Sequence, residues 1–116
     1  MTKSLSKGLP NLNPNYKLWL EYNGAYVFGP GAFALLTSIH QTGSITKAAK
    51  ELKMSYRYAW GVIRKIEKAL DAKLLDKYKG GKEGGGGAKV TEYGLSLMDL
   101  YSQVNNRFSE FISSIK

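Results

Sequence analysis

Basic and aromatic side chains recur along the segment 56–70, which reads YRYAWGVIRKIEKAL. At 100° per residue, the basic residues fall on the side opposite Ala59, Ile63 and Ile66. Long side chains with several N–H donors bind phosphates and the acceptor edges of bases in a DNA groove. This face is therefore a candidate surface for nucleic acid, with a solvated basic surface as the simpler alternative.

The first turn of the segment is the best place for a base contact, because the N-terminal part of a recognition helix points into the major groove. Arg57 occupies that position, and Gly61 leaves room for close approach of the backbone. The serine and tyrosines nearby can bind phosphates or pack against sugars, whereas Trp60, between the two faces, is interpreted as a packing residue. The candidate DNA-binding residues are Lys47, Ser55, Tyr56, Arg57, Tyr58, Arg64, Lys65, Lys68, Lys79 and Lys82.

The positive charge is concentrated around this segment. The chain has a formal charge of +8, and residues 44–91 contain 12 of its 17 basic and five of its nine acidic residues, a net charge of +7. Such a distribution favours a polyanion, most simply duplex DNA, although a basic surface can also serve only solubility.

Other chemistry has little support in the sequence. There is no cysteine and a single histidine, His40, so we expect no metal, no cofactor and no enzyme active site. No stretch has the roughly 20 apolar residues of a membrane span. We expect a cytoplasmic, chromosome-associated protein.

Two short helices must position the basic face. Ser44 and Ser55 are suited to cap helices over 45–52 and 56–70, with a turn at 53–54. An earlier helix over 32–42 ends at Gly43, a residue typical of helix ends. This arrangement predicts a helix-turn-helix.

Two hairpins are predicted beside these helices. Alternating residues around Asn23-Gly24 indicate a hairpin over 16–28. Strands over 73–79 and 88–90, joined by GGKEGGGG at 80–87, indicate a wing that would lie along phosphates. The glycine-rich loop lacks the Gly-Lys-Ser/Thr of a phosphate-binding loop, so no nucleotide site is expected.

The last predicted helix runs from 92 to about 115, after a capping Thr91, and its apolar residues recur at heptad spacing. We expect its distal half to pair with a second copy, the alternative being a helix packed on its own domain. The candidate dimerisation residues are Leu97, Tyr101, Val104, Phe108, Phe111 and Ile115.

The fold class expected from these elements is mainly α with small β elements. We predict a winged helix-turn-helix with an N-terminal β-hairpin and a long C-terminal dimerisation helix. Residues 1–15 are expected to form a flexible arm and residues 16–116 a single DNA-binding domain, which includes the C-terminal helix 91–115.

The motifs resemble a known family. The run 43–60, with its Ser-Tyr-x-x-Ala-Trp signature, is similar to the winged helix-turn-helix of the ModE molybdate-responsive regulators, which are related to the LysR type. The similarity continues through Leu74-Leu75, the glycine-rich wing and 90–94, and covers about residues 18–104. It implies a dimeric DNA-binding domain whose recognition helix begins at Ser55. The molybdate-binding domain is expected to be missing, so molybdate binding by this chain is not expected.

The sequence therefore predicts a transcriptional regulator that binds specific sites in double-stranded DNA as a homodimer. Two alternatives stay open at this point. One is an architectural protein that binds DNA with low specificity, and the other is a winged helix that contacts an acidic protein partner.

Overall fold

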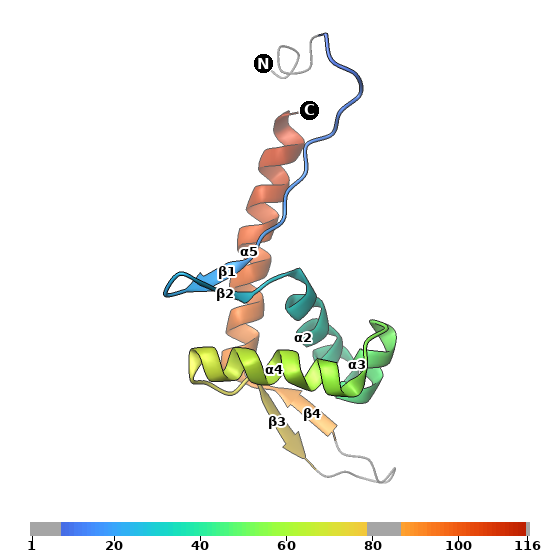
Figure 1. Cartoon of the computed structure of the whole chain (residues 1–116), viewed down its shortest axis with the longest axis vertical. Helices are drawn as coiled ribbons and strands as arrows, with labels where there is room; N and C mark the ends of the chain where they lie inside the picture. The colour runs from blue at the N-terminus through green and yellow to red at the C-terminus, as the bar shows by residue number, and fades with distance from the viewer. Residues whose placement is uncertain (1–7, 79–86, 116) are drawn as a thin grey trace.

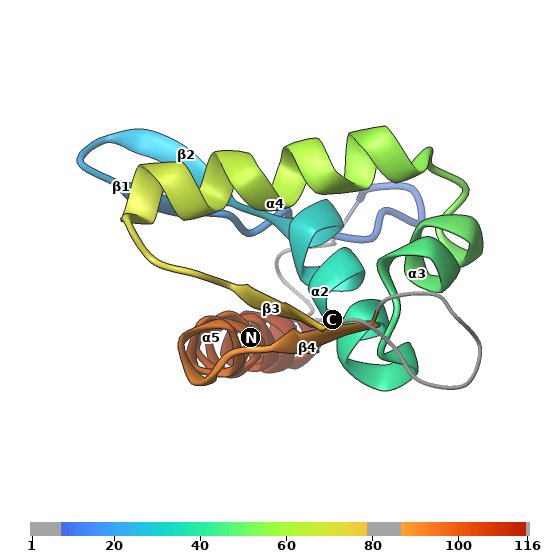
Figure 2. The ribbon, with the colours of Figure 1, turned by 90° about the horizontal axis from the view of Figure 1, so that it is seen from below.

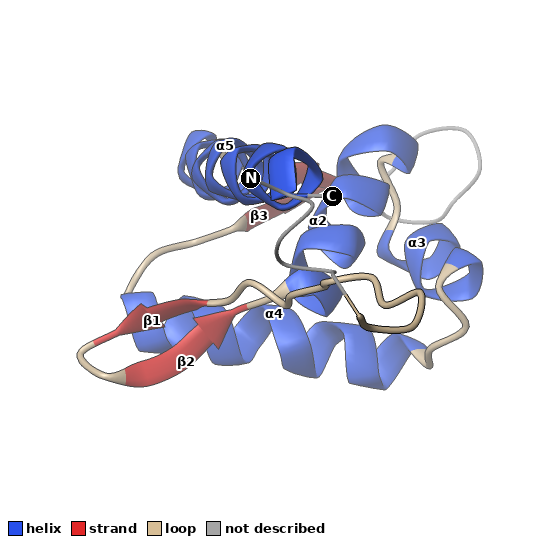
Figure 3. Cartoon of the chain, turned by 90° about the horizontal axis from the view of Figure 1, so that it is seen from above, coloured by secondary structure: helices blue, strands red, loops and turns tan. Residues whose placement is uncertain are grey.

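The computed structural model describes residues 8–78 and 87–115, which form helices and two antiparallel hairpins (Figures 1 and 3). The helices are α2 (Pro30–Thr42), α3 (Ile45–Glu51), α4 (Tyr56–Leu70) and α5 (Glu92–Ile115). The strands are β1 (Leu20–Tyr22), β2 (Ala25–Phe28), β3 (Leu75–Tyr78) and β4 (Gly87–Val90). The predicted mainly helical fold with small β elements is confirmed.

The helix-turn-helix forms because local signals end and begin its helices at fixed residues. Gly43 has φ 72° and donates its N–H to Ile39 O at 2.7 Å, which ends α2. Ser44 accepts the N–H of Lys47 at 3.1 Å and so caps α3. Lys53 has φ 58° and turns the chain toward α4. The predicted caps and turn are confirmed.

The β1–β2 hairpin turns at Asn23-Gly24, as expected. Both turn residues have positive φ, 51° and 81°, as a type I′ turn requires. Trp19 and Tyr26 stack across the hairpin with ring centroids 6.1 Å apart. Phe28, at the end of β2, is fully buried in the core.

The wing strand β3 begins at Leu75, two residues later than the predicted 73–79 strand. Before Leu75, the backbone groups bind elsewhere instead of in a strand ladder. Thr91 donates its hydroxyl to Lys73 O at 2.7 Å and its N–H to Leu74 O at 2.9 Å. On the other strand, Ala88 donates its N–H to Gly43 O at 3.0 Å. The base of the wing is therefore bound to both α5 and the end of α2. Residues 79–86, with Lys79 and Lys82, lie outside the described residues.

Helix α5 leaves the wing after Thr91, whose hydroxyl accepts the N–H of Gly94 at 3.0 Å. A Cβ at Gly94 would lie 2.7 Å from Val90 Cγ1 and 2.9 Å from Leu74 O, so this close crossing requires glycine. Seen from below, α4 and α5 lie on opposite sides of α2, and the wing strands lie beside α5 (Figure 2). Neither α5 nor another helix in the described part of the chain is long and apolar enough to cross a membrane.

A single core lies between α2, α3, α4, β4 and the near half of α5. Its largest fully buried side chains are Phe28, Leu35, Leu36, Ile39, Ile63 and Leu74. The distal half of α5 extends beyond this core, and the N-terminal segment runs in the same direction (Figure 1). The principal extents are 61 × 31 × 21 Å. The N-terminal segment reaches that half through Tyr16, whose hydroxyl is 2.9 Å from both Asn105 O and Asn105 Oδ1.

Candidate nucleic-acid interface

Helix α4 presents a row of exposed residues on the side away from the core. We call this row the crest and define it as Arg57, Gly61, Arg64 and Lys68, all exposed. The opposite side of the helix is buried at Ala59, Ile63 and Ile66. The division follows directly from helical periodicity, as predicted.

The start of α4 is held by its N-cap. Ser55 accepts the N–H of Tyr58 at 3.0 Å, and Met54 donates its N–H to Ala49 O at 3.0 Å. Together these bonds fix the turn between α3 and α4. They fix Arg57 in the first turn of an anchored helix, where it is exposed.

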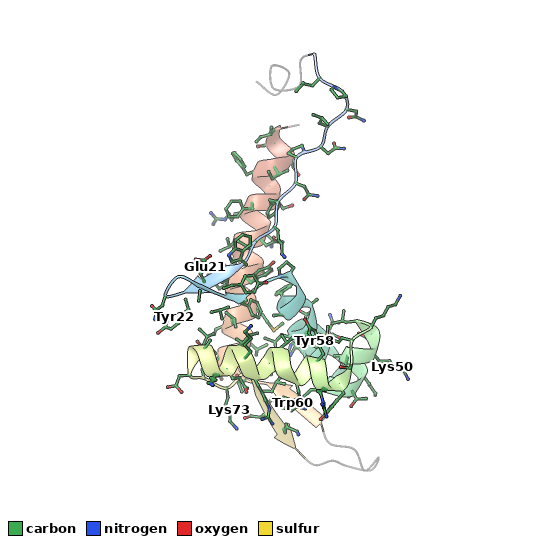
Figure 4. The ribbon with its side chains drawn as sticks, viewed as in Figure 1. Glu21, Tyr22, Lys50, Tyr58, Trp60 and Lys73 are labelled. Carbon is green, nitrogen blue, oxygen red and sulfur yellow. The ribbon has the colours of Figure 1, made fainter. Side chains whose placement is uncertain are left out.

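The side of α4 that faces the wing has a cluster around Trp60 that the sequence analysis did not predict (Figure 4). The indole N–H donates to the hydroxyl of Tyr56 at 2.8 Å. The guanidinium carbon of Arg64 lies 5.1 Å from the ring centroid, and Nζ of Lys77 lies 4.8 Å from it. Lys77 comes from β3, so the contact could be found only with the tertiary structure.

An open groove runs between α4 and β3 beside this cluster. Its basic lining residues are Arg64, Lys68, Lys73 and Lys77. Glu67, which also lines the groove, uses Oε2 to accept the N–H groups of Leu74 and Leu75, at 2.8 and 3.4 Å. Glu67 therefore binds the backbone that leads into the wing. Asp71 and Asp76 also line the groove, so its charged lining residues are four cations and three carboxylates.

The opposite flank of α4 carries two of the predicted DNA-binding residues. Tyr58 and Lys65 line a pocket of about 440 Å³ between α4, β2 and the start of α2. Figure 4 shows Tyr58 on the side of α4 away from the wing. The predicted residues are thus not one patch: Tyr58 and Lys65 are separated by the crest from Tyr56, Trp60 and the groove. Lys47 is exposed on α3, one helix earlier.

The predicted dimerisation residues on α5 divide into two groups. Tyr101 is 4% exposed, stacks on Phe33 with centroids 4.8 Å apart and donates its hydroxyl to Leu18 O at 3.0 Å. It belongs to the core of its own domain and is not available to a second copy. Leu97, Val104 and Ile115 are half-buried, and Phe108 and Phe111 are 46% and 60% exposed.

Helical periodicity alone could not separate these groups, because Tyr101 has the same spacing as the exposed residues. It also missed two members of the exposed row. Tyr93 and Leu100 are 45% and 52% exposed and fall within about 40° of Val104 and Phe111 around the helix. We call these four residues the α5 stripe.

Residues 31–95 match the family of bacterial regulatory helix-turn-helix proteins of the lysR type. The match covers more than half of the chain and contains α2 from its second residue, α3, α4, β3 and β4. The chain belongs to this LysR family.

Several curated relatives of this LysR-type chain are named transcriptional regulator ModE, and another is named a molybdenum-pterin-binding protein. Transcriptional regulator ModE of Haemophilus influenzae is 38% identical over 89 residues, which is 77% of this chain and 34% of that protein. ModE of Yersinia pestis is 43% identical over 72 residues, 62% of this chain and 27% of the relative. Molybdenum-pterin-binding protein MopB of Rhodobacter capsulatus is 36% identical over 97 residues, 84% and 35% of the two chains. The resemblance to the DNA-binding part of ModE-type regulators is confirmed.

The LysR-type chain spans about a third of the length of these relatives. Among solved structures, ArgP from Mycobacterium tuberculosis aligns with a TM-score of 0.55 at 20% identity, over 74% of this chain and 30% of that one. At this identity the likeness concerns the fold alone.

Proposed function

We propose that this chain is a transcriptional regulator that binds specific sites in duplex DNA through the crest of α4. The observation that carries the proposal is the exposed, capped start of α4 with Arg57 in its first turn. In this position a guanidinium can bind the O6 and N7 acceptors of a guanine in the major groove. The backbone contacts would come from Lys68 on the crest and from the groove beside the wing.

The distribution of charge supports the same orientation. The groove cations Lys73 and Lys77 lie on the wing side of α4, and Lys47 is on the neighbouring helix. A duplex seated on the crest would meet basic side chains on both sides of the recognition helix. Lys79 and Lys82 remain predicted phosphate contacts of the wing.

We further propose that the chain acts as a homodimer through the α5 stripe. Tyr93, Leu100 and Phe111 are large apolar side chains exposed by 45%, 52% and 60%. Near the wing, the stripe is continuous with a groove lined by Trp19, Tyr22 and Leu70. A two-fold axis along α5 would set two copies of α4 for half-sites one helical turn apart, or a multiple of it.

Selection of bound duplexes from a random pool at fixed salt concentration tests the proposal. We expect an enriched sequence with two related half-sites for the wild-type chain. Arg57→Ala should weaken binding to the selected site by about 1–3 kcal/mol and relax the preference at one base position. Lys68→Ala is the matched control, since a phosphate contact should weaken binding to all duplexes alike and lower the salt slope by about one.

Two results would contradict the proposal. Equal losses for Arg57→Ala on selected and random duplex would remove the base contact. Recovery of no enriched sequence, with uniform retardation of all fragments, would instead indicate an architectural DNA-binding protein.

A further inference from the structure

We infer that Trp60 is a positioning residue that holds Arg64 of α4 and Lys77 of β3 together as a pair for one DNA backbone strand. The inference rests on the proposed function and adds to it a positioning role for one side chain. Trp60 would not contact DNA itself. It would act through the two cations that lie over its ring.

The ring is held in place by its own helix. Trp60 is half-buried on the wing side of α4, and its N–H donates to the Tyr56 hydroxyl one turn earlier, at 2.8 Å. This hydrogen bond sets the rotation of the indole about its side-chain torsions. The ring therefore offers a fixed surface between α4 and β3.

Two cations from different elements use that surface. Arg64 approaches the ring to 5.1 Å and Lys77 to 4.8 Å, both within the distance at which the electron-rich ring attracts a cation. Two like charges near one another repel, and this attraction offsets the repulsion. Removal of the ring would leave the two cations free to move apart.

The contact also supplies a second attachment for the wing. Glu67 anchors β3 at Leu74 and Leu75 through backbone bonds. Lys77 lies two residues farther along the strand, beyond these bonds, and pairs with Ala88 in the ladder. The Trp60 contact thus ties the strand to the recognition helix at a point where Glu67 no longer reaches.

Both cations line the groove between α4 and β3, where a DNA strand beside the major groove would pass. If they are held at a fixed spacing, less side-chain freedom is lost when phosphates bind. Arg64 and Lys77 should therefore contribute cooperatively, in a way that depends on the ring between them.

A double-mutant cycle with Trp60→Leu and Lys77→Met tests the inference, with duplex affinity as the readout. Each single variant should weaken binding about two- to fivefold, the worth of a surface cation–π contact. The double variant should lose less affinity than the product of the two single losses, because a replaced Lys77 can no longer lose its positioning, while the loss at Arg64 remains. Trp60→Phe, which keeps an aromatic face, should restore part of the affinity lost in Trp60→Leu.

Lys73→Met is the matched control, because Lys73 is exposed and lines the same groove without lying over the ring. The loss of duplex affinity in Lys73→Met should multiply with the loss in Trp60→Leu. A multiplicative loss for Lys77→Met as well would overturn the inference, as would failure of Trp60→Phe to bind better than Trp60→Leu.

A second measurement needs no DNA. In a Trp19→Phe background, Trp60 is the only tryptophan, so its quenching by acrylamide reports the cover over its ring. Lys77→Met should increase that quenching and Lys73→Met should leave it unchanged. Equal quenching in both variants would show that Lys77 does not cover the Trp60 ring, and would overturn the inference. A wild-type chain that binds no duplex would overturn the proposed function. Intact wild-type binding, with affinity losses that multiply for Trp60→Leu and Lys77→Met, would overturn the inference alone.

Discussion

The carboxylate of Glu67 accepts the backbone N–H of Leu74 at 2.8 Å, so the last turn of α4 holds the segment that leads into β3. The same oxygen lies 3.4 Å from the N–H of Leu75. Both leucines are buried, which excludes water as a ready substitute. These hydrogen bonds fix the position of the wing relative to α4 only a few residues after the helix ends.

Replacement of this carboxylate should destabilise the fold. Glu67→Leu leaves buried N–H groups without an acceptor, and we expect the free energy of unfolding to fall by about 1–3 kcal/mol. Urea denaturation measures the change. Glu67→Gln keeps one acceptor oxygen and should lose less. Equal stability of the Leu and Gln variants would show that the hydrogen bond does not contribute.

Gly94→Ala should also lower stability. The added Cβ would come within 2.7 Å of Val90 Cγ1 and 2.9 Å of the Leu74 carbonyl, so the start of α5 must shift. We expect a loss of about 1–3 kcal/mol on urea denaturation, despite the higher helix propensity of alanine. Gly31→Ala is the control, because a Cβ there has no neighbour within 4 Å. If Gly94→Ala and Gly31→Ala change the free energy of unfolding equally, the close approach of Gly94 to Val90 and Leu74 is not the cause of the loss.

Gly61→Ala should separate stability from DNA binding. A Cβ at Gly61 has no neighbour within 4 Å, so alanine should stabilise α4 by about 0.5–1 kcal/mol. Gly61 is on the crest, where the proposed function brings the DNA backbone or base edges close. We therefore expect weaker duplex binding, measured by fluorescence anisotropy, in a more stable protein. Unchanged affinity would mean that this part of the crest is not in the groove.

Tyr101 gives the fold a pH dependence at high pH. Burial raises the pKa of its hydroxyl above the ordinary value of 10, with smaller contributions from Tyr26 and Tyr16. Because the folded state binds this proton more tightly, the stabilisation is present below pH 10 and is lost as the pH rises through the raised pKa. Thermal unfolding from about pH 8 to about pH 11 should show a steeper decline for the wild type than for Tyr101→Phe. Parallel curves would contradict this assignment.

Phe111→Glu should dissociate the proposed dimer. The substitution places a charge in the α5 stripe, and we expect the dissociation constant to rise at least about tenfold, from a cost of about 1.4 kcal/mol or more. Analytical ultracentrifugation gives the measurement. Leu95→Glu is the control, since Leu95 is 37% exposed but lies about 160° around the helix from Phe111. A monomeric wild-type chain at micromolar concentration would reject the dimer outright.

The parts of the fold that depend on neighbours in sequence were predicted well. Ser44, Ser55 and Thr91 cap their helices as expected, and Asn23-Gly24 forms the expected turn. Each of these signals acts within about four residues, so no tertiary information is required.

The parts that depend on distant segments were not predicted. Tyr101 has the spacing of a dimerisation residue, but Phe28 and Phe33 enclose it within its own domain. Nζ of Lys77 lies 4.8 Å from the ring centroid of Trp60 only because Glu67 and Thr91 direct β3 back along α4. Helical angles also placed Tyr58 and Lys65 beside the crest, without showing that their flank faces β2. In each case a local pattern identified the helix face, and the tertiary structure decided its neighbour.

The crest of α4 lies near one end of α5, and the distal half of α5 extends away from it (Figure 1). Substitutions at sites this far apart, with no shared contacts, usually have additive effects. On the proposed function, the distance between two half-sites and the bases read within each could therefore evolve independently. Protein engineers could redesign the pairing at Val104 and Phe111, the two residues of the α5 stripe beyond Tyr101, and retain the operator preference of the original chain.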